Sequence, residues 1–266
     1  MRVCMTEARV WPLWQYNKAI TACRQNGQWQ EAFSTLNLIY LQRVLPDVIS
    51  YNATISVCEA AAEWQQALIV ISRLQTKMLL PNVVTIGALL GACQKAGQWQ
   101  TSLVLLSEVD VNAVKANIIT YNSTISACGQ SAKDQRALAL LTEAKTLAIE
   151  TTIVTYNAVL SALEKAEEWQ MALFLLRKIG KVSLEADVIS YNAAISACEK
   201  AAEWQHALAL MSELKDMTQP TVISYNAAIS ACEKCHQWPY AVLLLEAMEE
   251  ERLEANVFLG LHHIDI

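Results

Sequence analysis

A pattern of apolar and polar positions recurs along the chain at intervals of about 35 residues. The segment VISYNAAISACEK stands at 188–200 and again, letter for letter, at 222–234. Related segments occur in the same register at 48–59, 118–130 and 153–165. Self-similarity at a fixed period of this length is typical of repeat proteins. The pattern therefore divides the chain into seven repeats, over residues 13–47, 48–82, 83–117, 118–152, 153–187, 188–221 and 222–256.

Each repeat is predicted to form two amphipathic helices, as repeat 188–221 illustrates. Apolar residues at helical spacing form one stripe on its first helix, which comprises Tyr191, Ile195 and Cys198. A polar stripe runs beside it and comprises Asn192, Ser196 and Lys200. After a short break at 201–203, the second helix has an apolar stripe of its own, with Trp204, Ala207, Leu208, Met211 and Leu214. Spacings of three and four residues place such side chains on one face of a helix.

A hydroxyl residue at the third place of the repeat is predicted to be the N-cap of the first helix. An oxygen at an N-cap accepts a hydrogen bond from a first-turn N–H that has no partner within the helix. The first repeat has Gln15 there, and the other six have Ser or Thr: Ser50, Thr85, Thr120, Thr155, Ser190 and Ser224.

These patterns predict an all-α fold. One helical hairpin buries too little apolar surface to be stable alone, so neighbouring repeats have to stack into a solenoid with a concave and a convex face. With only 7 Gly and 5 Pro, the chain has too few turn-forming residues for an all-β fold. Residues 1–12 precede the first repeat, and 257–266 form a tail or a truncated repeat. Neither end supplies the polar cap that such an array needs, so a fragment or a mispredicted gene product is expected.

Composition and charge narrow the possible functions. The chain has 54% hydrophobic and 17% charged residues, which excludes disorder as its main state. Its formal net charge of -6 provides no overall attraction to nucleic acid or to anionic lipid, so a polyanion site has to be a local patch. No apolar run approaches the roughly eighteen residues of a membrane-spanning helix, and no membrane partner is expected.

Cysteines recur at the eleventh place of the repeat, where a role in packing is predicted. Leu163 occupies that place in the fifth repeat, which indicates that the position needs an apolar side chain rather than a thiol. Equivalent residues of adjacent repeats are expected to be roughly 10 Å apart, too far for a disulfide. We therefore expect thiols, in a reducing compartment, at Cys23, Cys58, Cys93, Cys128, Cys198 and Cys232.

The motif C-x-x-C-H at Cys232, Cys235 and His236 matches the pattern for covalent haem attachment. Cys232 is, however, the regular cysteine of its repeat, and the other two residues replace an Ala-Ala pair of the preceding repeat. A turn between two helices also lacks the enclosed apolar cavity that haem needs. We therefore expect no cofactor, and no metal site that uses His262 and His263.

Tryptophan opens the second helix in six repeats, and Asp134 replaces it in the fourth. Aromatic side chains can stack on bases of single-stranded RNA, but these share a face with the Ala-Leu pair of the second helix. They are therefore predicted to be core residues: Trp29, Trp64, Trp99, Trp169, Trp204 and Trp238. The chain has no phosphate-binding glycine loop and no zinc-protease, hydrolase or deaminase motif, so no catalysis is expected.

The chain resembles the pentatricopeptide repeat family in the sequence V-I-S-Y-N-A-A-I-S-A, followed by C-E-K, Ala-Leu in the second helix, and P-D or P-N at the repeat's end. The resemblance spans about nine-tenths of the chain and is to pure, P-type arrays of 35-residue repeats. Tetratricopeptide repeats share the hairpin, but their W-x-x-L-G-x-x-Y first helix is not found. The resemblance implies a right-handed α-solenoid superhelix of helix-turn-helix repeats, each of which binds one nucleotide of single-stranded RNA.

The resemblance implies that the fifth and last residues of each repeat read the base edge. The pairs are Asn17 with Asp47, Asn52 with Asn82, Gly87 with Asn117, Asn122 with Thr152, Asn157 with Asp187, Asn192 with Thr221 and Asn226 with Asn256. In the family, Asn with Asp favours uracil and Asn with Asn favours pyrimidines. Because Gly87 breaks the pattern, the third repeat is expected to read nothing. The implied target is pyrimidine-rich, U-Y-N-Y-U-Y-Y from 5′ to 3′, where Y is a pyrimidine and N any base.

The resemblance also implies roles for the second and thirteenth residues of the repeat. The second packs against the base, and here it is Trp14, Ile49, Val84, Ile119, Val154, Ile189 and Ile223. A lysine at the thirteenth place contacts phosphate, and the matching residues are Lys95, Lys165, Lys200 and Lys234. The other three repeats have Gln25, Ala60 and Gln130 there. Independently of the family, the repeated asparagine at the fifth place needs a reason, because Asn is a poor helix former.

The expected function is sequence-selective binding of single-stranded RNA for its processing, stabilisation or translation, with recruited RNA-processing proteins as further partners. The resemblance implies a chloroplast or mitochondrion, although no transit peptide is visible in residues 1–12. Two alternatives remain open. The first alternative is a helical-repeat scaffold for protein interactions. Scattered lysines on the concave face would favour it, whereas a regular lysine ladder favours RNA. The second alternative is an enzyme whose catalytic part lies outside this chain.

Overall fold

The computed structural model describes residues 11–111 and 116–251 of the chain, and the side chains of 109–111 are excepted. Within these residues the protein has fourteen α-helices, one short 3-10 helix and no strand, which confirms the all-α prediction. The helices group into two compact units, Met1–Ser131 and Ala132–Ile266, and each is described by itself. The boundary falls between the two helices of the fourth repeat.

Each repeat contributes a first and a second helix. The first helices begin at the first residue of each predicted repeat: α1 (Leu13–Ala22), α3 (Val48–Ala60), α5 (Val83–Lys95), α7 (Ile118–Gln130), α9 (Ile153–Lys165), α11 (Val188–Lys200) and α13 (Val222–Lys234). The second helices begin at the tryptophans or at Asp134: α2 (Trp29–Leu41), α4 (Trp64–Thr76), α6 (Trp99–Val111), α8 (Asp134–Thr146), α10 (Trp169–Ile179), α12 (Trp204–Met217) and α14 (Trp238–Glu250). A 3-10 turn, Gly180–Val182, follows α10.

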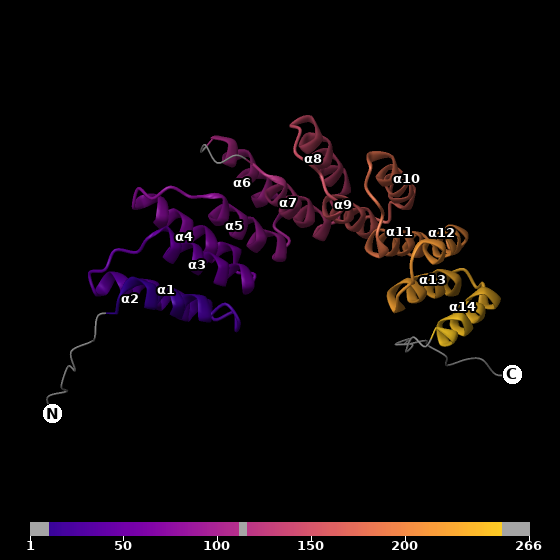
Figure 1. Cartoon of the computed structure of the whole chain (residues 1–266), viewed down its shortest axis with the longest axis horizontal. Coiled ribbons are helices and arrows are strands. Elements are labelled where there is room, and N and C mark those ends of the chain that lie inside the picture. The colour runs from indigo at the N-terminus through magenta and orange to yellow at the C-terminus, as the bar shows by residue number, and fades with distance from the viewer. Residues whose placement is uncertain (1–10, 112–115, 252–266) are drawn as a thin grey trace, which may run out of the picture. The chain divides into compact units, whose positions relative to one another are not determined.

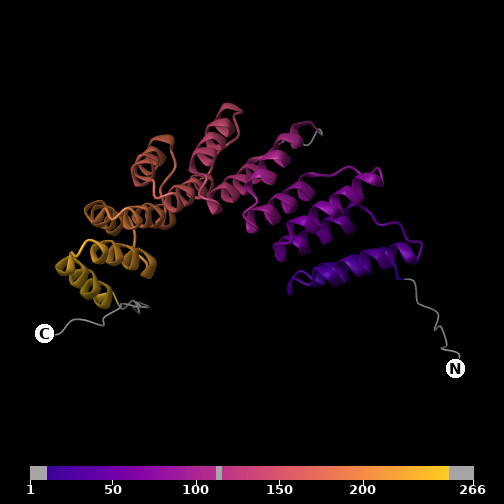
Figure 2. The ribbon, with the colours of Figure 1, turned by 180° about the vertical axis from the view of Figure 1, so that it is seen from behind.

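First helices pack against first helices of neighbouring repeats. In the first unit α3 lies between α1 and α5, and α5 contacts α7; in the second unit α11 lies between α9 and α13. Within each unit, second helices contact the first helix of their own repeat and that of the next, as α2 does with α1 and α3. Within each unit the hairpins therefore follow one another in chain order, which Figure 1 and the view from behind in Figure 2 show. First helices form one layer and second helices the other.

The N-caps of the first helices lie three residues before the predicted hydroxyl residues. The last residue of the preceding repeat is the cap, and its side chain accepts from the backbone N–H of the hydroxyl residue; Asp47 Oδ1 and Ser50 N are 2.9 Å apart. The hydroxyl residue therefore occupies the third helical position, and in five helices its side chain completes a capping box. The prediction of Ser or Thr caps was wrong because a Ser or Thr signal alone does not distinguish the cap from its partner three residues later.

The turn inside every repeat contains one residue in the left-handed conformation. Two of these residues are glycines, Gly27 and Gly97, with φ of +61° and +64°. The other five have side chains at φ of 51° to 61°: Ala62, Ala132, Glu167, Ala202 and His236. Because this conformation costs an L-residue roughly 1 kcal/mol or more, the packing of the two helices against each other holds these turns against local strain.

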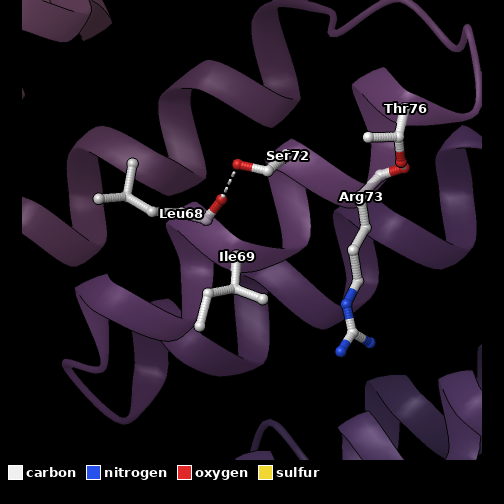
Figure 3. Close-up of a pocket in the computed structure, with 5 residues that line it drawn as sticks. All are labelled: Leu68, Ile69, Ser72, Arg73 and Thr76. Atoms are coloured by element: carbon white, nitrogen blue, oxygen red, sulfur yellow. Dashed lines mark hydrogen bonds between the residues drawn. The ribbon is translucent and has the colours of Figure 1, made fainter.

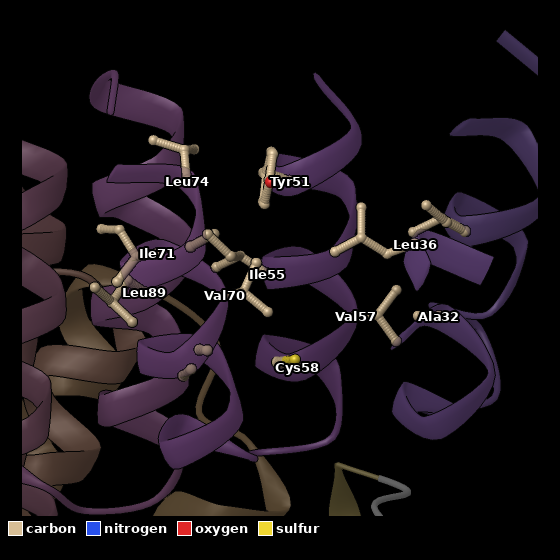
Figure 4. Close-up of a cluster of buried hydrophobic side chains, with 14 of the residues drawn as sticks. Ala32, Leu36, Tyr51, Ile55, Val57, Cys58, Val70, Ile71, Leu74 and Leu89 are labelled. Atoms are coloured by element: carbon tan, nitrogen blue, oxygen red, sulfur yellow. The ribbon is translucent and has the colours of Figure 1, made fainter. Parts of the chain in front are cut away.

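Most side chains of both predicted apolar stripes are buried, and the cysteines at the eleventh place with them. In Figure 4, Leu36 of α2 lies near Val57 of α3, while Val70 and Leu74 of α4 lie beside Ile55. The eleventh-place side chains are at most 8% exposed, and Leu163, like five of the cysteines, is fully buried. None of the described cysteines forms a disulfide, as predicted. Burial raises the pKa of the Cys58 thiol to about 12 and the pKa values of Cys93 and Cys198 to about 11.

The tryptophans are half-buried, which corrects the prediction that they are core residues. Two of them lie at the junction of successive second helices: the Trp169 ring is 4.6 Å from that of His206, and the Trp204 ring is 5.1 Å from that of Tyr240. Trp29 and Trp64 pack, partly buried, against the core of the first unit. Trp238, in the last described repeat, is 46% exposed. A side chain at the first position of a helix lies at the edge of the layer, so part of it stays exposed. No described helix is long and apolar enough to cross a membrane.

Candidate nucleic-acid interface

A row of apolar side chains lies exposed on the first helices. The second residue of all seven repeats is 59% to 64% exposed: Trp14, Ile49, Val84, Ile119, Val154, Ile189 and Ile223. Each follows directly on the first residue of its helix, on the side that the core leaves open. Contiguous exposed apolar patches are typical of interaction surfaces, whereas single exposed apolar residues need no explanation. This row coincides with the residues assigned to base packing.

The fifth and last residues of a repeat lie within hydrogen-bonding distance of each other in four repeats. In the fifth repeat, Asn157 Nδ2 donates to Asp187 Oδ1 at 3.0 Å and to Oδ2 at 3.2 Å. The hydroxyl of Ser190, from the next repeat, donates to Asn157 Oδ1 at 2.6 Å. Asp187 Oδ1 also accepts from the backbone N–H of Ser190 at 2.9 Å. One asparagine, one helix cap and one hydroxyl thus form a network that joins two repeats.

The same network recurs in both units. The Asn17 amide donates to Asp47 at 3.5 Å. The amides of Asn52 and Asn192 donate at 3.3 Å to Asn82 and Thr221, respectively. The hydroxyls of Ser50, Thr85 and Ser224 donate to these asparagines at 2.7, 2.6 and 2.6 Å, respectively. An amide and a carboxylate have more donors and acceptors than this network uses, so groups remain available to a ligand.

Asp187 is held as a carboxylate. Burial by itself raises the pKa of this group, but hydrogen bonds from the Ser190 N–H, the Asn157 amide and the Ser190 hydroxyl outweigh it and lower the pKa below its ordinary value. An ionised carboxylate only accepts hydrogen bonds. In the fifth repeat the pair therefore offers an acceptor from Asp187 beside an amide that both donates and accepts.

A pocket of about 430 Å³ lies where three first helices meet in the first unit. Its apolar walls include Ile49 and Val84, the second residues of adjacent repeats, and its polar groups include the pair Asn52 and Asn82. Arg24, from the first repeat, also lines it. An apolar slot with a few convergent polar groups is the usual form of a small-ligand site. The structure thus brings together, in one pocket, residues that the sequence assigned separately to packing and to reading.

A second pocket, of about 310 Å³, lies on α4, the second helix of its repeat. It is lined by Leu68, Ile69, Ser72, Arg73 and Thr76. Its polar groups are already engaged: the Ser72 and Thr76 hydroxyls donate to carbonyl oxygens of their own helix, and Arg73 donates to Asn37 at 3.2 Å. Figure 3 shows the Arg73 side chain extending away from Ser72 and Thr76. This pocket has no convergent polar groups for a ligand.

Three of the four candidate phosphate lysines are paired with glutamates of the preceding repeat. Lys95 lies 3.6 Å from Glu59, Lys200 lies 3.0 Å from Glu164, and Lys234 lies 2.7 Å from Glu199. No ion pair involves Lys165 in the part of the chain that the structure describes, and this side chain is exposed. The lysines are therefore at the surface, but three of the four already pair with a carboxylate.

The third repeat forms no such side-chain pair. Gly87 has no side chain, and the hydroxyl of Thr120 donates to the Asn117 carbonyl instead, at 2.7 Å. Asn122 and Thr152 belong to different units, so their relation is not described. Asn256 lies outside the described residues, as do His262 and His263, and Asn226 Oδ1 is buried with no partner among the described residues.

The C-x-x-C-H motif is part of the repeat's packing. Cys232 is fully buried, whereas the Cys235 thiol donates to the Ala202 carbonyl of the preceding repeat at 3.0 Å. His236 occupies the left-handed turn position, with φ of 56°. Within residues 11–111 and 116–251, no three His, Cys, Asp or Glu side chains are grouped to hold a metal ion.

Sequence reasoning missed Arg24 and the three paired glutamates. Arg24 stands at the twelfth place of its repeat, one residue before the place where lysine was sought, and Gln25 follows it. The glutamates occupy the same twelfth place, one repeat before each paired lysine. Comparing residues one repeat apart, rather than within a repeat, would have found these ion pairs.

Models of a known protein family match the same repeats. A family model described as pentatricopeptide repeat domain matches residues 12–61, 104–165 and 174–234, and a PPR repeat model matches 154–182 and 223–253. The comparison with curated proteins gives no match. Among solved structures, the pentatricopeptide repeat protein PPR10 from maize is 19% identical over 91% of this chain, with a TM-score of 0.67. This chain covers only 40% of the length of that protein.

Two further structures are complexes with RNA. PPR10 with an 18-nt psaJ RNA element is 20% identical, with a TM-score of 0.57, over 93% of this chain and 41% of that one. The PPR domain of Arabidopsis thaliana protein-only RNase P 1, in complex with tRNA, is 14% identical, with a TM-score of 0.53, over 62% of this chain and 88% of that domain. At these identities the structures show a shared fold. Since the family model matches more than half of the sequence and the repeats fold as helical hairpins, the chain belongs to the pentatricopeptide repeat family.

Proposed function

We propose that this protein binds single-stranded RNA with one nucleotide per repeat. The observation that carries the proposal is the pocket in which Ile49 and Val84 flank the pair Asn52 and Asn82. A base is flat and has apolar faces and polar edges. Two apolar side chains from successive repeats can cover its faces, while the amide pair meets its edge.

The exposed second residues of other successive repeats can cover the faces of a base in the same way. Each second residue can contact the base of its own repeat and that of the preceding one, so within each unit these residues define a regular series of slots. Contacts between bases and protein side chains at such platforms tolerate any base, because every base has an apolar face. Affinity is therefore assigned to the second residues and selectivity to the asparagine pairs.

The hydrogen-bonding groups favour pyrimidines in specific repeats. Asp187 is an acceptor and can receive the ring N–H that uracil has and cytosine lacks. The Asn52–Asn82 pair contains both donors and acceptors, which suits either pyrimidine. These properties support the target U-Y-N-Y-U-Y-Y, in which the third repeat contributes no reading side chain.

The solved relatives support RNA as the ligand, since PPR10 and the RNase P domain are both described in complexes with RNA. Arg24 adds a cation at the pocket of the second repeat, where Ala60 stands in place of the phosphate lysine. The proposal extends, through the family resemblance, to RNA processing, stabilisation or translation in a chloroplast or mitochondrion. Organelle fractionation with immunodetection would test that extension.

The alternative is a scaffold that binds peptides. One observation favours it, because glutamates neutralise three of the four lysines that RNA would use. The exposed apolar row could equally cover side chains of an extended peptide.

Fluorescence anisotropy with labelled U-Y-N-Y-U-Y-Y RNA, an all-purine RNA of the same length and the duplex form tests the proposal. We expect selective binding of the pyrimidine-rich single strand. Val84→Ser should weaken this binding about five-fold, because one apolar contact to the base is lost. Val104→Ser is the matched control, since Val104 is also exposed, at 55%, but lies on the second helix α6. Equal affinity for all three RNAs, or equal effects of the two variants, would contradict the proposal.

A further inference from the structure

Acidic side chains reach from one repeat onto the phosphate lysine of the next. Glu59, Glu164 and Glu199 occupy the twelfth place of the second, fifth and sixth repeats, at the end of the first helix. Their carboxylates contact Lys95, Lys200 and Lys234, which occupy the thirteenth place one repeat further on. The same lysines are those that the proposed function assigns to the RNA backbone.

The glutamates are fixed more firmly than the lysines. The glutamate side chains are 18% to 25% exposed, whereas the lysine side chains are 32% to 46% exposed. Glu199 Oε1 also accepts from the Ser230 hydroxyl at 3.2 Å. Glu59 lies over Gly91 of the next repeat so closely that a Cβ atom there would stand 3.0 Å from its carboxylate. Two of the three carboxylates therefore have a contact besides the lysine, whereas the lysines are the more exposed partners in all three pairs.

We propose that these glutamates compete with RNA phosphates for the lysines and thereby set the strength of RNA binding. This inference rests on the proposed function. A carboxylate and a phosphate present the same chemistry to an ammonium group, namely negatively charged oxygen acceptors. Each RNA contact by a paired lysine therefore replaces an existing ion pair and leaves a glutamate without its partner.

The competition is balanced rather than prohibitive, because exposed ion pairs of this kind contribute little to stability. Removing one competing carboxylate is expected to tighten RNA binding by two- to five-fold, which corresponds to the usual strength of such pairs. The sequence also provides a lysine without a competitor: the twelfth place of the fourth repeat is Gly129, one repeat before Lys165. Phosphate affinity thus differs between repeats according to the twelfth residue of the preceding one.

The test compares two variants that remove the same charge at the same place of the repeat. Glu164→Gln frees Lys200, whereas Glu233→Gln frees no lysine, because Glu233 has no ion pair among the described residues. Binding of the labelled U-Y-N-Y-U-Y-Y RNA is measured by anisotropy at several salt concentrations for wild type and both variants. We expect Glu164→Gln to bind two- to five-fold more tightly than Glu233→Gln. Adding Lys200→Ala to Glu164→Gln should abolish the gain.

The outcomes separate this inference from the proposed function. If wild type binds RNA selectively and the two glutamine variants bind equally, the competition is refuted while RNA binding stands. If the gain persists without Lys200, the effect of Glu164 is general electrostatics and the inference is wrong. If wild type shows no selective RNA binding, the proposed function fails and the inference fails with it.

Discussion

The Asn157 amide donates to the Asp187 carboxylate at 3.0 Å, although the two residues are 30 positions apart. Asp187 caps the first helix of the following repeat, so the residue that is proposed to read a base also holds two repeats together. A change at the last residue of a repeat is consequently a change in helix stability as well as in base preference. Substitutions at the fifth residue avoid the cap and provide the cleaner test.

Asn157→Thr should shift base preference at the fifth nucleotide alone from uracil toward guanine. The shorter hydroxyl leaves room for a wider purine and offers a different hydrogen-bond pattern, and a mismatched base leaves polar groups unpaired at a cost of about 1–3 kcal/mol. The measurement compares wild type and variant on RNAs with U or G in fifth position. An RNA with G in sixth position is the control. If both proteins rank the RNAs identically, Asn157 does not read a base.

Gly87→Asn should give the third repeat a base preference that it lacks. A Cβ atom added at Gly87 meets nothing within 4 Å, so the asparagine has space, and Asn117 stands in the last position to complete a pyrimidine-reading pair. Gly87→Ala is the matched control, because it also removes a helical glycine and should raise stability by up to about 1 kcal/mol. Anisotropy with each base in third position should show a pyrimidine preference for the asparagine variant only.

Lys165→Ala should lower the salt dependence of RNA binding more than Lys200→Ala. Each lysine that contacts single-stranded RNA contributes about 0.7 to the slope of log affinity against log salt. Lys165 has no ion pair in the described structure and should show this full loss, whereas Lys200 already neutralises Glu164. Within each variant, affinity should fall by the same factor for every RNA sequence. An unchanged slope for Lys165→Ala would show that this lysine is only a solvated surface residue.

Ala202→Gly should stabilise the protein by about 1 kcal/mol, since Ala202 has φ of 57° and a glycine adopts that conformation without steric cost. Ala201→Gly is the control, because Ala201 has φ of −81° and gains nothing from glycine. Urea unfolding followed by circular dichroism measures both. A stabilised Ala201 variant, or an unchanged Ala202 variant, would contradict the assignment of strain to this turn.

The buried thiols should resist alkylation in the folded protein. Burial raises the pKa of Cys58 to about 12, so almost no thiolate is present at pH 8, and the side chain is inaccessible as well. Among the described cysteines, Cys235, which is half-buried, should react first. Iodoacetamide labelling with mass spectrometry, with and without urea, measures the order. Cys235→Ala should leave the helical spectrum unchanged, and reductant and chelator should not affect it.

The candidate site was predictable where one place of the repeat carries one role. The apolar second residues and the asparagines stand out because seven copies average away the variation of single positions. The capping arrangement was not predictable in this way, since Asp187 and Ser190 both have side chains suited to an N-cap. The edge position of Trp204 was also hidden, because helical spacing gives the face of a residue but not how much of the layer covers it.

The sequence alone determined the period, the two helices of each repeat and the burial of the eleventh residue, because these follow from apolar spacing within 35 residues. Only the tertiary structure decided what meets across repeats. The pocket at Ile49 and Val84, the bond from the Ser190 hydroxyl to Asn157 and the pairing of Lys200 with Glu164 all join different repeats. Such contacts depend on how one hairpin is set against the next, which the packing of whole helices fixes.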